Sequence, residues 1–369
     1  MKVQRVCLPR SDPLQPEDFC WLLLDDNFCP VKPVQEFLTY LHNVERSPNT
    51  IRSYALHLKL YWQYLAQTGQ DWTAIGLSEL AQFVNWLRNP LPDVIPLQTI
   101  EAKRAESTVN TILAAVSAFY DYQQRLGAVK VLPLYRNQTG NHRRYKDFLY
   151  HISKTKPAAT RLLKLKVPSH LPKTLTASQV QQLVQACHTL RDRFLLCLLY
   201  ETGMRIGQVL GLRHSDIHSW DNTIIVVPRQ HNANQARAKT NHSYPVYVST
   251  QLMTLYTNYL LQEFGEIDSD YVFVNLWEGV VGQPLRYGSV IALFHRLGKQ
   301  TGLVVHPHLL RHTHATELLS SGWNPAYVQK RLGHAQVQTT INTYFHPSEA
   351  DLKQAYQTYL EKKRKDGQL

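Results

Sequence analysis

The chain has 369 residues, of which 44% are hydrophobic, and it carries a formal net charge of +12 at pH 7 with an isoelectric point near 9.4. This length exceeds one ordinary hydrophobic core and predicts two domains of typical size. Because the sequence lacks any run of about eighteen apolar residues, the positive charge indicates an anionic polymer such as DNA or RNA as the partner, rather than a membrane.

The N-terminus and the cysteines indicate the compartment. The first residues, MKVQRVCLPRSDPLQPEDF, show no long apolar stretch after their charges, so we expect neither a signal peptide nor an anchor, and a cytoplasmic location. The cysteines are five, an odd number, and form no C-x-x-C pair, which argues against a disulfide framework and a cysteine zinc site. We expect reduced thiols at Cys7, Cys20, Cys29, Cys187 and Cys197.

Amphipathic helices are predicted along residues 31–135. SPNTIRSYALHLKLYWQYL has apolar residues at three- and four-residue steps and Pro48 at its entry. LSELAQFVNWLRN begins near Ser78 and ends before Pro90, whose missing amide stops the helix. STVNTILAAVSAFYDYQQRLG ends at Gly127. We therefore expect a helical domain at 31–135, after a short N-terminal extension at 1–30.

A strongly basic segment follows the helical region. Between Arg136 and Lys173, ten lysines or arginines face a single acidic residue, Asp147. Such a run is commonly a solvated linker. The high total charge and nearby aromatic residues such as Tyr145 and Tyr150 favour a strap along a phosphate backbone instead. We place the basic interdomain linker at residues 136–170.

A new domain is expected from residue 171. Thr176 and Gln179 fit a capping box at the start of a helix. Further on, NTIIVV and YPVYVS predict two strands joined by a long loop, which holds Lys239. This is the only lysine between Lys173 and Lys299. Most lysines in such loops are simply solvated, but an isolated one at the end of a mobile β-loop also suits a proton donor to a leaving alkoxide.

Arg205 is expected at the start of a helix. The preceding helix, DRFLLCLLYETG, breaks at Gly203 and is followed by MRIGQVLGLRHSDI. A cation beside free helix amides is a good arrangement for an oxyanion. Taken alone, this window favours the plainer alternative of a surface arginine or an ion pair with Asp216 or Glu201.

The stretch HPHLLRHTHATELL, from His306 to Leu319, is rich in imidazoles. A helix that begins near Pro307 puts His308, Arg311 and His312 on one face. His308 and His312 have the spacing of two zinc ligands. A zinc protease, however, requires H-E-x-x-H, and Leu309 stands at the glutamate position.

Two further observations bear on the metal alternative. Glu317 is the only carboxylate between Thr301 and Thr340, so a magnesium or two-metal nuclease site would lack its oxygen ligands. The fixed cation of Arg311 repels a divalent ion but binds a phosphate in bidentate fashion. A cationic phosphate pocket is therefore favoured over a metal-dependent hydrolase that would use His306, His308, His312 and His314.

The last part of this region predicts two short helices. Asn324 and Pro325 fit the start of one that ends at Gly333, and His334 follows. We expect the Thr339 and Thr340 pair to cap a last helix that carries Tyr344. A single tyrosine among twenty is far more often packed than nucleophilic, so position alone assigns Tyr344 no role.

Taken in order, these motifs resemble the tyrosine recombinase family, also called phage integrases. The resemblance rests on R-I-G-Q-V-L-G-L-R, the lone lysine in a β-hairpin, H-L-L-R-H-T-H-A-T, L-G-H and T-T-I-N-T-Y-F-H, and it covers the chain from about residue 31. Within the family, the motifs look most like those of transposon-encoded and integron-like integrases. The implied fold is mainly α with a small β-sheet. A helical core-binding, SAM-like domain at 31–135 and a mixed α+β catalytic domain at 171–350 would form a C-shaped DNA clamp.

The resemblance also implies roles for individual residues. Arg205 and Arg311 would bind the scissile phosphate. Lys239 would protonate the departing 5′ oxygen, and Tyr344 would be the nucleophile. His308 would contact the phosphate and also take the tyrosine proton.

One further residue matches the pocket of the family, and two residues differ from the family pattern. His334 matches the family's last phosphate-contacting position. Gln208 stands where members commonly have glutamate, and Leu309 replaces an often acidic or polar residue. Gln208 leaves open how the helix of Arg205 is supported, although an amide can still hydrogen-bond there. A covalent phosphotyrosine retains the bond energy, so neither a metal nor a cofactor is implied.

The implied function is site-specific recombination through a 3′-phosphotyrosyl intermediate, for integration, excision or transposition of a mobile element. The expected partners are double-stranded DNA core sites, further copies of the chain in a homotetramer, and a partner recombinase or accessory DNA-bending protein. The C-terminal helix or tail at 351–369 would dock in trans. The alternatives are a non-catalytic DNA-binding protein on the same fold, the metal-dependent hydrolase above, and a type IB topoisomerase, which shares the chemistry.

Overall fold

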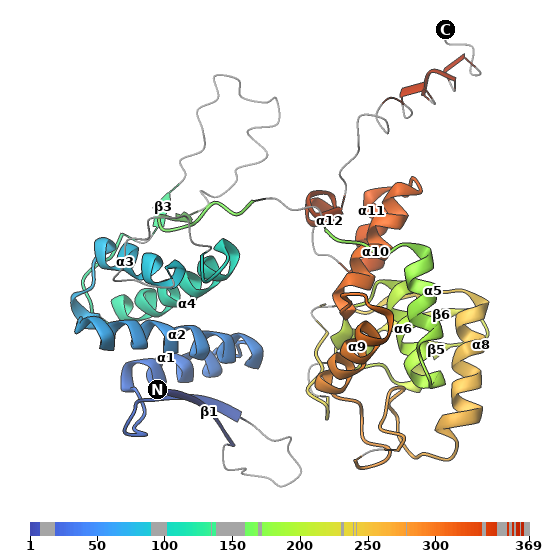
Figure 1. The fold of residues 1–369 in the computed structure, drawn as a ribbon, viewed down its shortest axis with the longest axis horizontal. Coiled ribbons are helices and arrows are strands. Elements are labelled where there is room, and N and C mark those ends of the chain that lie inside the picture. Colours follow the sequence, from blue (N-terminus) through green and yellow to red (C-terminus); the bar gives the residue numbers. More distant parts are fainter. Residues whose placement is uncertain are drawn as a thin grey trace. The chain divides into compact units, whose positions relative to one another are not determined.

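The computed structural model describes residues 1–7, 19–89, 102–133, 135–137, 159–168, 172–229, 232–238, 240, 242–277, 279–333, 337–344, 353, 356–357, 359–361 and 363–364. Two of the expected site residues, Lys239 and His334, lie outside these ranges. The contacts divide the chain into two units, Met1–Ser169 and His170–Leu369, which are described separately (Figure 1). Within the described ranges, no helix has the length and apolar character needed to cross a membrane.

The first unit is a helical domain with short strands. Its elements are β1 (Lys2–Cys7), β2 (Phe19–Leu24), α1 (Lys32–Asn43), α2 (Pro48–Thr68), the 3-10 helix η1 (Trp72–Ala74), α3 (Leu77–Arg88), α4 (Glu106–Arg125), β3 (Tyr135–Asn137) and β4 (Ala159–Arg161). The core is aromatic: Phe37, Phe83 and Phe119 are buried, and the hydroxyls of Tyr61 and Tyr120 lie 2.6 Å apart. The predicted helices from 48, 78 and 107 onward are confirmed within a few residues.

An antiparallel hairpin of β1 and β2 was not predicted. The strands pair from Lys2 opposite Leu24 to Cys7 opposite Phe19, and they contact α1 and α2. Leu23 of this hairpin is fully buried, and Arg52 of α2 lies 5.5 Å from the Trp21 ring. The hairpin therefore belongs to the core of the first unit.

The second unit combines a helical layer with a small sheet. Its elements are α5 (Ala177–Gln185), α6 (Leu190–Thr202), α7 (Ile206–Val209), the 3-10 helix η2 (His214–Asp216), β5 (Ile217–His218), β6 (Thr223–Val226), β7 (Tyr244–Tyr247), α8 (Thr250–Tyr259), the π-helical turn η3 (Leu260–Phe264), α9 (Tyr287–Thr301), α10 (Pro307–Ser320), α11 (Pro325–Leu332) and α12 (Val337–Tyr344). The sheet has the order β5-β6-β7 and is antiparallel. The two predicted strands and the capping box of Thr176 with Gln179 are confirmed. The mainly helical fold class with a small β-sheet is confirmed as well.

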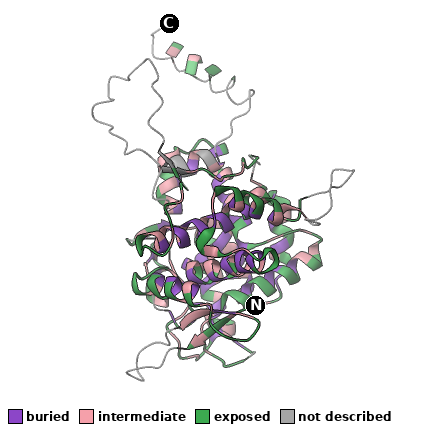
Figure 2. Ribbon diagram, turned by 90° about the vertical axis from the view of Figure 1, so that its left-hand side faces the viewer, coloured by how far each residue is buried: buried purple, intermediate pink, exposed green. Residues whose placement is uncertain are grey.

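Helix α6 runs through the core of the second unit. Phe194, Leu195, Leu196, Leu198 and Leu199 are all fully buried. The other residues of α6 are half-buried or buried and none is exposed, so the helix needs no amphipathic pattern, unlike most helices, which show buried residues on one side and exposed residues on the other (Figure 2).

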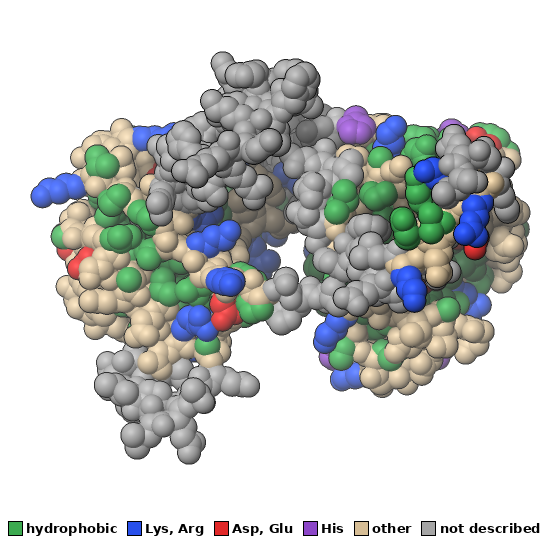
Figure 3. Space-filling view, turned by 90° about the horizontal axis from the view of Figure 1, so that it is seen from above, with side chains coloured by type: hydrophobic (Ala, Val, Ile, Leu, Met, Phe, Trp, Pro, Cys, Tyr) green, Lys and Arg blue, Asp and Glu red, His purple; other side chains and the backbone are tan. Residues whose placement is uncertain are grey.

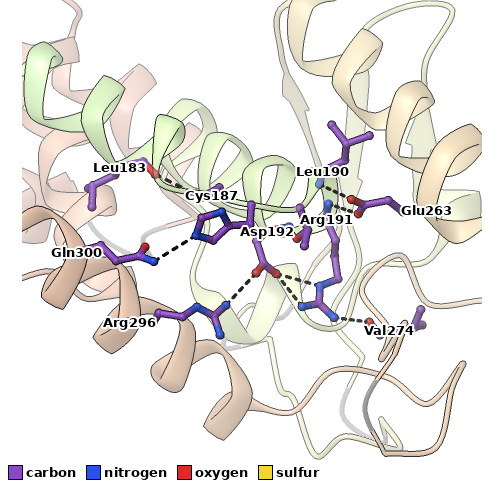
Figure 4. Close-up of polar contacts among 11 residues, drawn as sticks. Leu183, Cys187, Leu190, Arg191, Asp192, Glu263, Val274, Arg296 and Gln300 are labelled. Atoms are coloured by element: carbon purple, nitrogen blue, oxygen red, sulfur yellow. Dashed lines mark hydrogen bonds and ion pairs between the residues drawn. The ribbon is translucent and has the colours of Figure 1, made fainter.

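The first turn of α6 is fixed by carboxylates. Glu263 accepts hydrogen bonds from the backbone N–H groups of Leu190 and Arg191 at 2.7 and 2.9 Å (Figure 4). Asp192, buried in the same turn, binds Arg191 at 2.8 Å and Arg296 at 3.2 Å. Negative charge at a helix N-terminus is stabilising. These contacts fix the helix whose other end reaches the candidate site.

One predicted cap is wrong. Helix α12 begins at Val337, so the pair of Thr339 and Thr340 lies inside the helix rather than at its cap. Thr340 is fully buried, and Tyr344, four residues later, is buried too. Residues four apart share one helix face, so both threonine and tyrosine face the interior, and Thr340 packs inside the helix instead of capping it.

Candidate functional site

Arg311 lies at the centre of the site and is almost completely buried, with 1% of its side chain area exposed. Pro307 starts α10, and the His306 ring accepts the backbone N–H of Leu309 at 3.2 Å, which caps the helix. The two guanidinium arms of Arg311 then donate to the carbonyl of Gly203 at 2.7 Å and that of Leu332 at 2.9 Å. Arg311 thus joins the ends of α6 and α11.

Burial and a second cation act on the charge of Arg311. Burial, and then the nearby Arg205, lower the pKa of Arg311 to about 10. The group is still protonated at neutral pH. The two carbonyls that hold this buried cation are uncharged, and a buried positive charge attracts an anion.

Arg205 is the residue before α7. Its backbone N–H donates to Gln208 Oε1 at 2.8 Å, and its Nη1 donates to the carbonyl of Gly333 at 3.5 Å. The carboxylates suggested as ion-pair partners are used elsewhere. Asp216 binds Arg229 through two bonds of 2.6 and 2.8 Å, and Glu201 accepts from the Ser249 hydroxyl at 2.8 Å.

Tyr344 is the last residue of α12 and lies beside Arg311. Its side chain is 6% exposed and packs in a small apolar cluster with Leu332. A hydrogen bond with Tyr344 raises the pKa of Arg311, against the larger effect of burial. The Tyr344 ring centroid lies 5.4 Å from that of His312. The phenol therefore lies next to both a guanidinium and an imidazole.

Two imidazoles of α10 adjoin this group. The rings of His308 and His312 lie 4.5 Å apart. Burial, then His312 and Arg311, lower the pKa of His308 to about 4, and burial, then His306 and Arg311, lower that of His312. His308 is therefore neutral at pH 7 and has a free lone pair for a proton.

The other histidine of α10, His314, has a structural role. It is buried, and its Nε2 accepts from Arg331 Nε at 3.0 Å. Arg331 also donates to the carbonyls of Tyr247 and Glu201 at 3.0 and 2.9 Å. The four-histidine cage of the metal alternative is thus not assembled, because His314 binds an arginine and His306 caps the helix. The described residues hold no cluster suited to a metal ion.

The segment before Lys239 is bound tightly to α7. The Asn234 side chain donates to the carbonyls of Leu210 and Leu285, both at 2.9 Å. It also accepts from the backbone N–H of Ala236 at 3.0 Å. Gly207 of α7 approaches the carbonyl oxygen of Arg237 so closely that a Cβ on Gly207 would lie 2.5 Å from it. Lys239 itself lies outside the described residues.

The structure thus brings together four of the six expected residues, Arg205, His308, Arg311 and Tyr344. His334 directly follows Gly333 but lies outside the described residues, as does Lys239. Sequence reasoning missed three side chains at the site: Tyr244, Asn234 and Arg331. Their only sequence signal was a polar or aromatic residue within or next to predicted strands and helices, which is too common to be informative.

Two comparisons of the sequence address the family. Residues 173–351 match the model of the phage integrase family, and residues 34–127 match the N-terminal SAM-like domain of phage integrases. Transposase A from transposon Tn554 of Staphylococcus aureus is 46% identical over 366 residues, which is 98% of this chain and 99% of the relative. Tyrosine recombinase XerD of Halalkalibacterium halodurans is 28% identical, covering 88% of this chain and 95% of the relative.

Solved structures agree in fold. The Tn1549 transposon integrase in complex with transposon right end DNA matches with a TM-score of 0.61 at 17% identity, over 89% of this chain and 99% of that one. A lambda integrase dimer bound to a core site matches with a TM-score of 0.56 at 17% identity, over 86% and 96%. Given the 46% identity along nearly the whole length and the two domain matches, the chain belongs to the phage integrase family of tyrosine recombinases.

Proposed function

We propose that the protein is a site-specific DNA recombinase that cuts and rejoins strands through a 3′-phosphotyrosyl intermediate, in the transposition of a mobile element. The observation that carries this proposal is the contact of Tyr344 with the buried cation Arg311. Relatedness to the Tn554 transposase supports the role in transposition.

The two arginines bind the scissile phosphate. The fork of Arg311 is fixed by the Gly203 and Leu332 carbonyls, so it needs little reorganisation when charge builds on the pentacoordinate phosphorus. Arg205 adds a second cation from α7. Loss of one preorganised donor of this kind typically lowers the rate about 10²- to 10³-fold. This electrostatic function is the one that metal ions perform in nucleases.

Tyr344 is the nucleophile. Its oxygen forms the bond to phosphorus while the bond from phosphorus to the 5′ oxygen breaks. His308 takes the phenol proton, because its imidazole is neutral in the free protein. A bound phosphate anion favours the protonated imidazole, so substrate binding makes His308 a stronger base.

Lys239 protonates the departing 5′ oxygen, and His334 contacts the phosphate. The support for Lys239 is its place two residues after Arg237, whose carbonyl lies against Gly207 in the helix that follows Arg205. For His334, the support is that the carbonyl of the preceding residue, Gly333, accepts from Arg205.

The partner is double-stranded DNA that carries core recombination sites. The net charge is +12, and Lys and Arg side chains recur over the face seen in Figure 3, where acidic ones are few. The helical and catalytic units close around the duplex as a C-shaped clamp. Four copies assemble on two sites, with the tail at 351–369 docked on a neighbouring copy. Exposed Tyr356 and Tyr359, whose rings lie 6.2 Å apart, offer aromatic contacts in the described part of this tail.

The test is covalent capture of DNA without metal. The parent protein and its Tyr344→Phe variant are incubated in EDTA with nicked duplexes from DNA that flanks the gene, and the products are separated on an SDS gel. A slow band that appears with the parent alone and disappears on protease treatment supports the proposal. Tyr327→Phe, at a tyrosine that is 64% exposed, is the matched control and should keep the band.

The capture assay, together with a DNA-binding assay and a plasmid-relaxation assay, distinguishes the alternatives. A band that persists in Tyr344→Phe removes Tyr344 as the nucleophile. Specific DNA binding by the parent without a band favours a non-catalytic DNA-binding protein. Relaxation of any supercoiled plasmid, without dependence on a site, favours a type IB topoisomerase.

A further inference from the structure

A second tyrosine, Tyr244, faces the same pocket. It is the first residue of β7, and its hydroxyl lies against Gly333, where an added Cβ would be 2.6 Å from the phenol oxygen. Burial raises the pKa of Tyr244, whereas the adjacent Arg311 and Arg205 lower it. The phenol is therefore close to both cations that are proposed to bind phosphate.

The direction of one hydrogen bond is fixed by chemistry. The backbone N–H of Arg205 can only donate, and it lies 2.8 Å from one end of the Gln208 amide, which must be the oxygen. The other end, the NH₂ group, then lies 3.1 Å from the Tyr244 hydroxyl. The Tyr244 oxygen is therefore the acceptor of this bond, and its own proton is left to donate.

A glutamate at position 208 would reverse this arrangement. A carboxylate accepts hydrogen bonds at both oxygens, so it would bind the Arg205 N–H with one and take the Tyr244 proton with the other. The amide of Gln208 is buried, at 3% exposure, and water cannot substitute for it. The departure from the family pattern at this position thus releases a hydrogen-bond donor.

The released proton has no acceptor among the described neighbours. The polar groups that act on the Tyr244 hydroxyl are the Gln208 NH₂ and two guanidinium groups, all of which are donors. The nearby Gly333 carbonyl accepts from Arg205, and within the described residues the hydroxyl of Tyr244 forms its hydrogen bond with Gln208 rather than with this carbonyl. A phosphate bound by Arg205 and Arg311 would supply the missing acceptor.

We propose that Tyr244 is a further catalytic residue, whose hydroxyl donates a hydrogen bond to one non-bridging oxygen of the scissile phosphate, with Gln208 as the positioning residue that directs it. This inference rests on the proposed function. It adds a neutral donor to the two cations, at a point where negative charge grows in the transition state.

The test uses Tyr244→Phe, which keeps the ring and removes the hydroxyl. Covalent complex formation is measured in single turnover with saturating nicked duplex, on a normal phosphodiester and on both separated diastereomers of a methylphosphonate at the scissile position. A methylphosphonate replaces one non-bridging oxygen with a methyl group. Tyr247→Phe, in the same strand and 66% exposed, is the matched control.

On the phosphodiester, we expect Tyr244→Phe to be about 10²-fold slower, with DNA affinity unchanged within about threefold. The defect should shrink to about threefold or less on the diastereomer that lacks the contacted oxygen, and persist on the other. Equal defects on both diastereomers would overturn the proposal, because a merely structural role does not distinguish two oxygens.

A second variant tests the same hydrogen bond without removing the Tyr244 side chain, so that a folding defect of Tyr244→Phe cannot account for the result. Gln208→Glu leaves the phenol in place but redirects its proton, so its defect should also be smaller on the diastereomer that lacks the contacted oxygen than on the other. The added carboxylate charge slows both diastereomers alike, so equal defects on the two would contradict the role assigned to Gln208. If the parent itself forms no covalent complex on the phosphodiester, the proposed function fails and not only the role of Tyr244.

Discussion

Replacement of Arg311 by lysine tests how much this buried arginine stabilises the contact between α6 and α11. Arg311 donates from two ends of one guanidinium to the carbonyls of Gly203 and Leu332. A lysine keeps the charge but is a single point, and it cannot replace both ends of the fork. Loss of one charged hydrogen bond costs about 1.5–3 kcal/mol of unfolding free energy. For a unit of about 200 residues, this lowers the Tm by roughly 3–12 °C.

The assay is thermal unfolding of the full chain, with Arg296→Lys as the control. Arg296 pairs with Asp192, but its side chain is 56% exposed, so this substitution should change the stability by less than about 1 kcal/mol. Arg311→Lys should also lower covalent complex formation about 10²- to 10³-fold, whereas the control should not. Equal Tm values for the two variants would refute the view that Arg311 joins α6 and α11.

Three further predictions concern other parts of the unit. Burial lowers the pKa of His314 to about 3 from 6.5, so its stabilising effect is complete above pH 6.5 and is lost as the pH falls toward 3. At pH 5 this amounts to about 2 kcal/mol (1.5 pH units at about 1.36 kcal/mol each), and urea unfolding of His314→Asn should show that much less acid sensitivity than the parent. Lys239→Ala should cleave the normal substrate about 10²- to 10⁴-fold more slowly. Its cleavage rate should recover on a substrate with a 5′-bridging sulfur, because a thiolate leaves without a proton from an acid. Asn234→Ala should show the same recovery, and Arg205→Ala should not. Removal of the chain after Asp351 should abolish recombination and largely spare binding to a single site, and equal loss of both would count against docking in trans.

The local structure was predictable wherever one segment contains its own signal. The capping box of Thr176 with Gln179 and the β-branched and aromatic residues of β6 and β7 are of this kind, and the structure has the cap and both strands. The β1–β2 hairpin has strands with β-forming residues, but eleven residues, 8–18, separate them, which is longer than a typical hairpin loop. Sequence periodicity therefore gave no reason to pair these strands.

The candidate site could be predicted only in part, because its geometry depends on contacts between distant residues. The prediction that Arg205 and Arg311 share one anion site came from the family motifs, and no local pattern indicated it. The bond of Gln208 to Tyr244 spans 36 residues, and that of Arg331 to the carbonyl of Glu201 spans 130. Such bonds form only once the sheet and helices have packed, and a single sequence does not show which distant segments come into contact.

The positive charges of the pocket destabilise the free protein and favour its complex with DNA. Burial, and then Arg205, lower the pKa of Arg311; burial is also the main cause that lowers the pKa of His308 and His312, and Arg311 adds to it, so each cation disfavours a further positive charge beside it. A phosphate opposes these effects, because its negative charge favours the protonated form of each group. The largely buried α6 and the carboxylates at its start hold the pocket together without the anion. Binding of DNA therefore relieves a repulsion that already exists in the folded chain, which links the stability of the catalytic unit directly to its substrate.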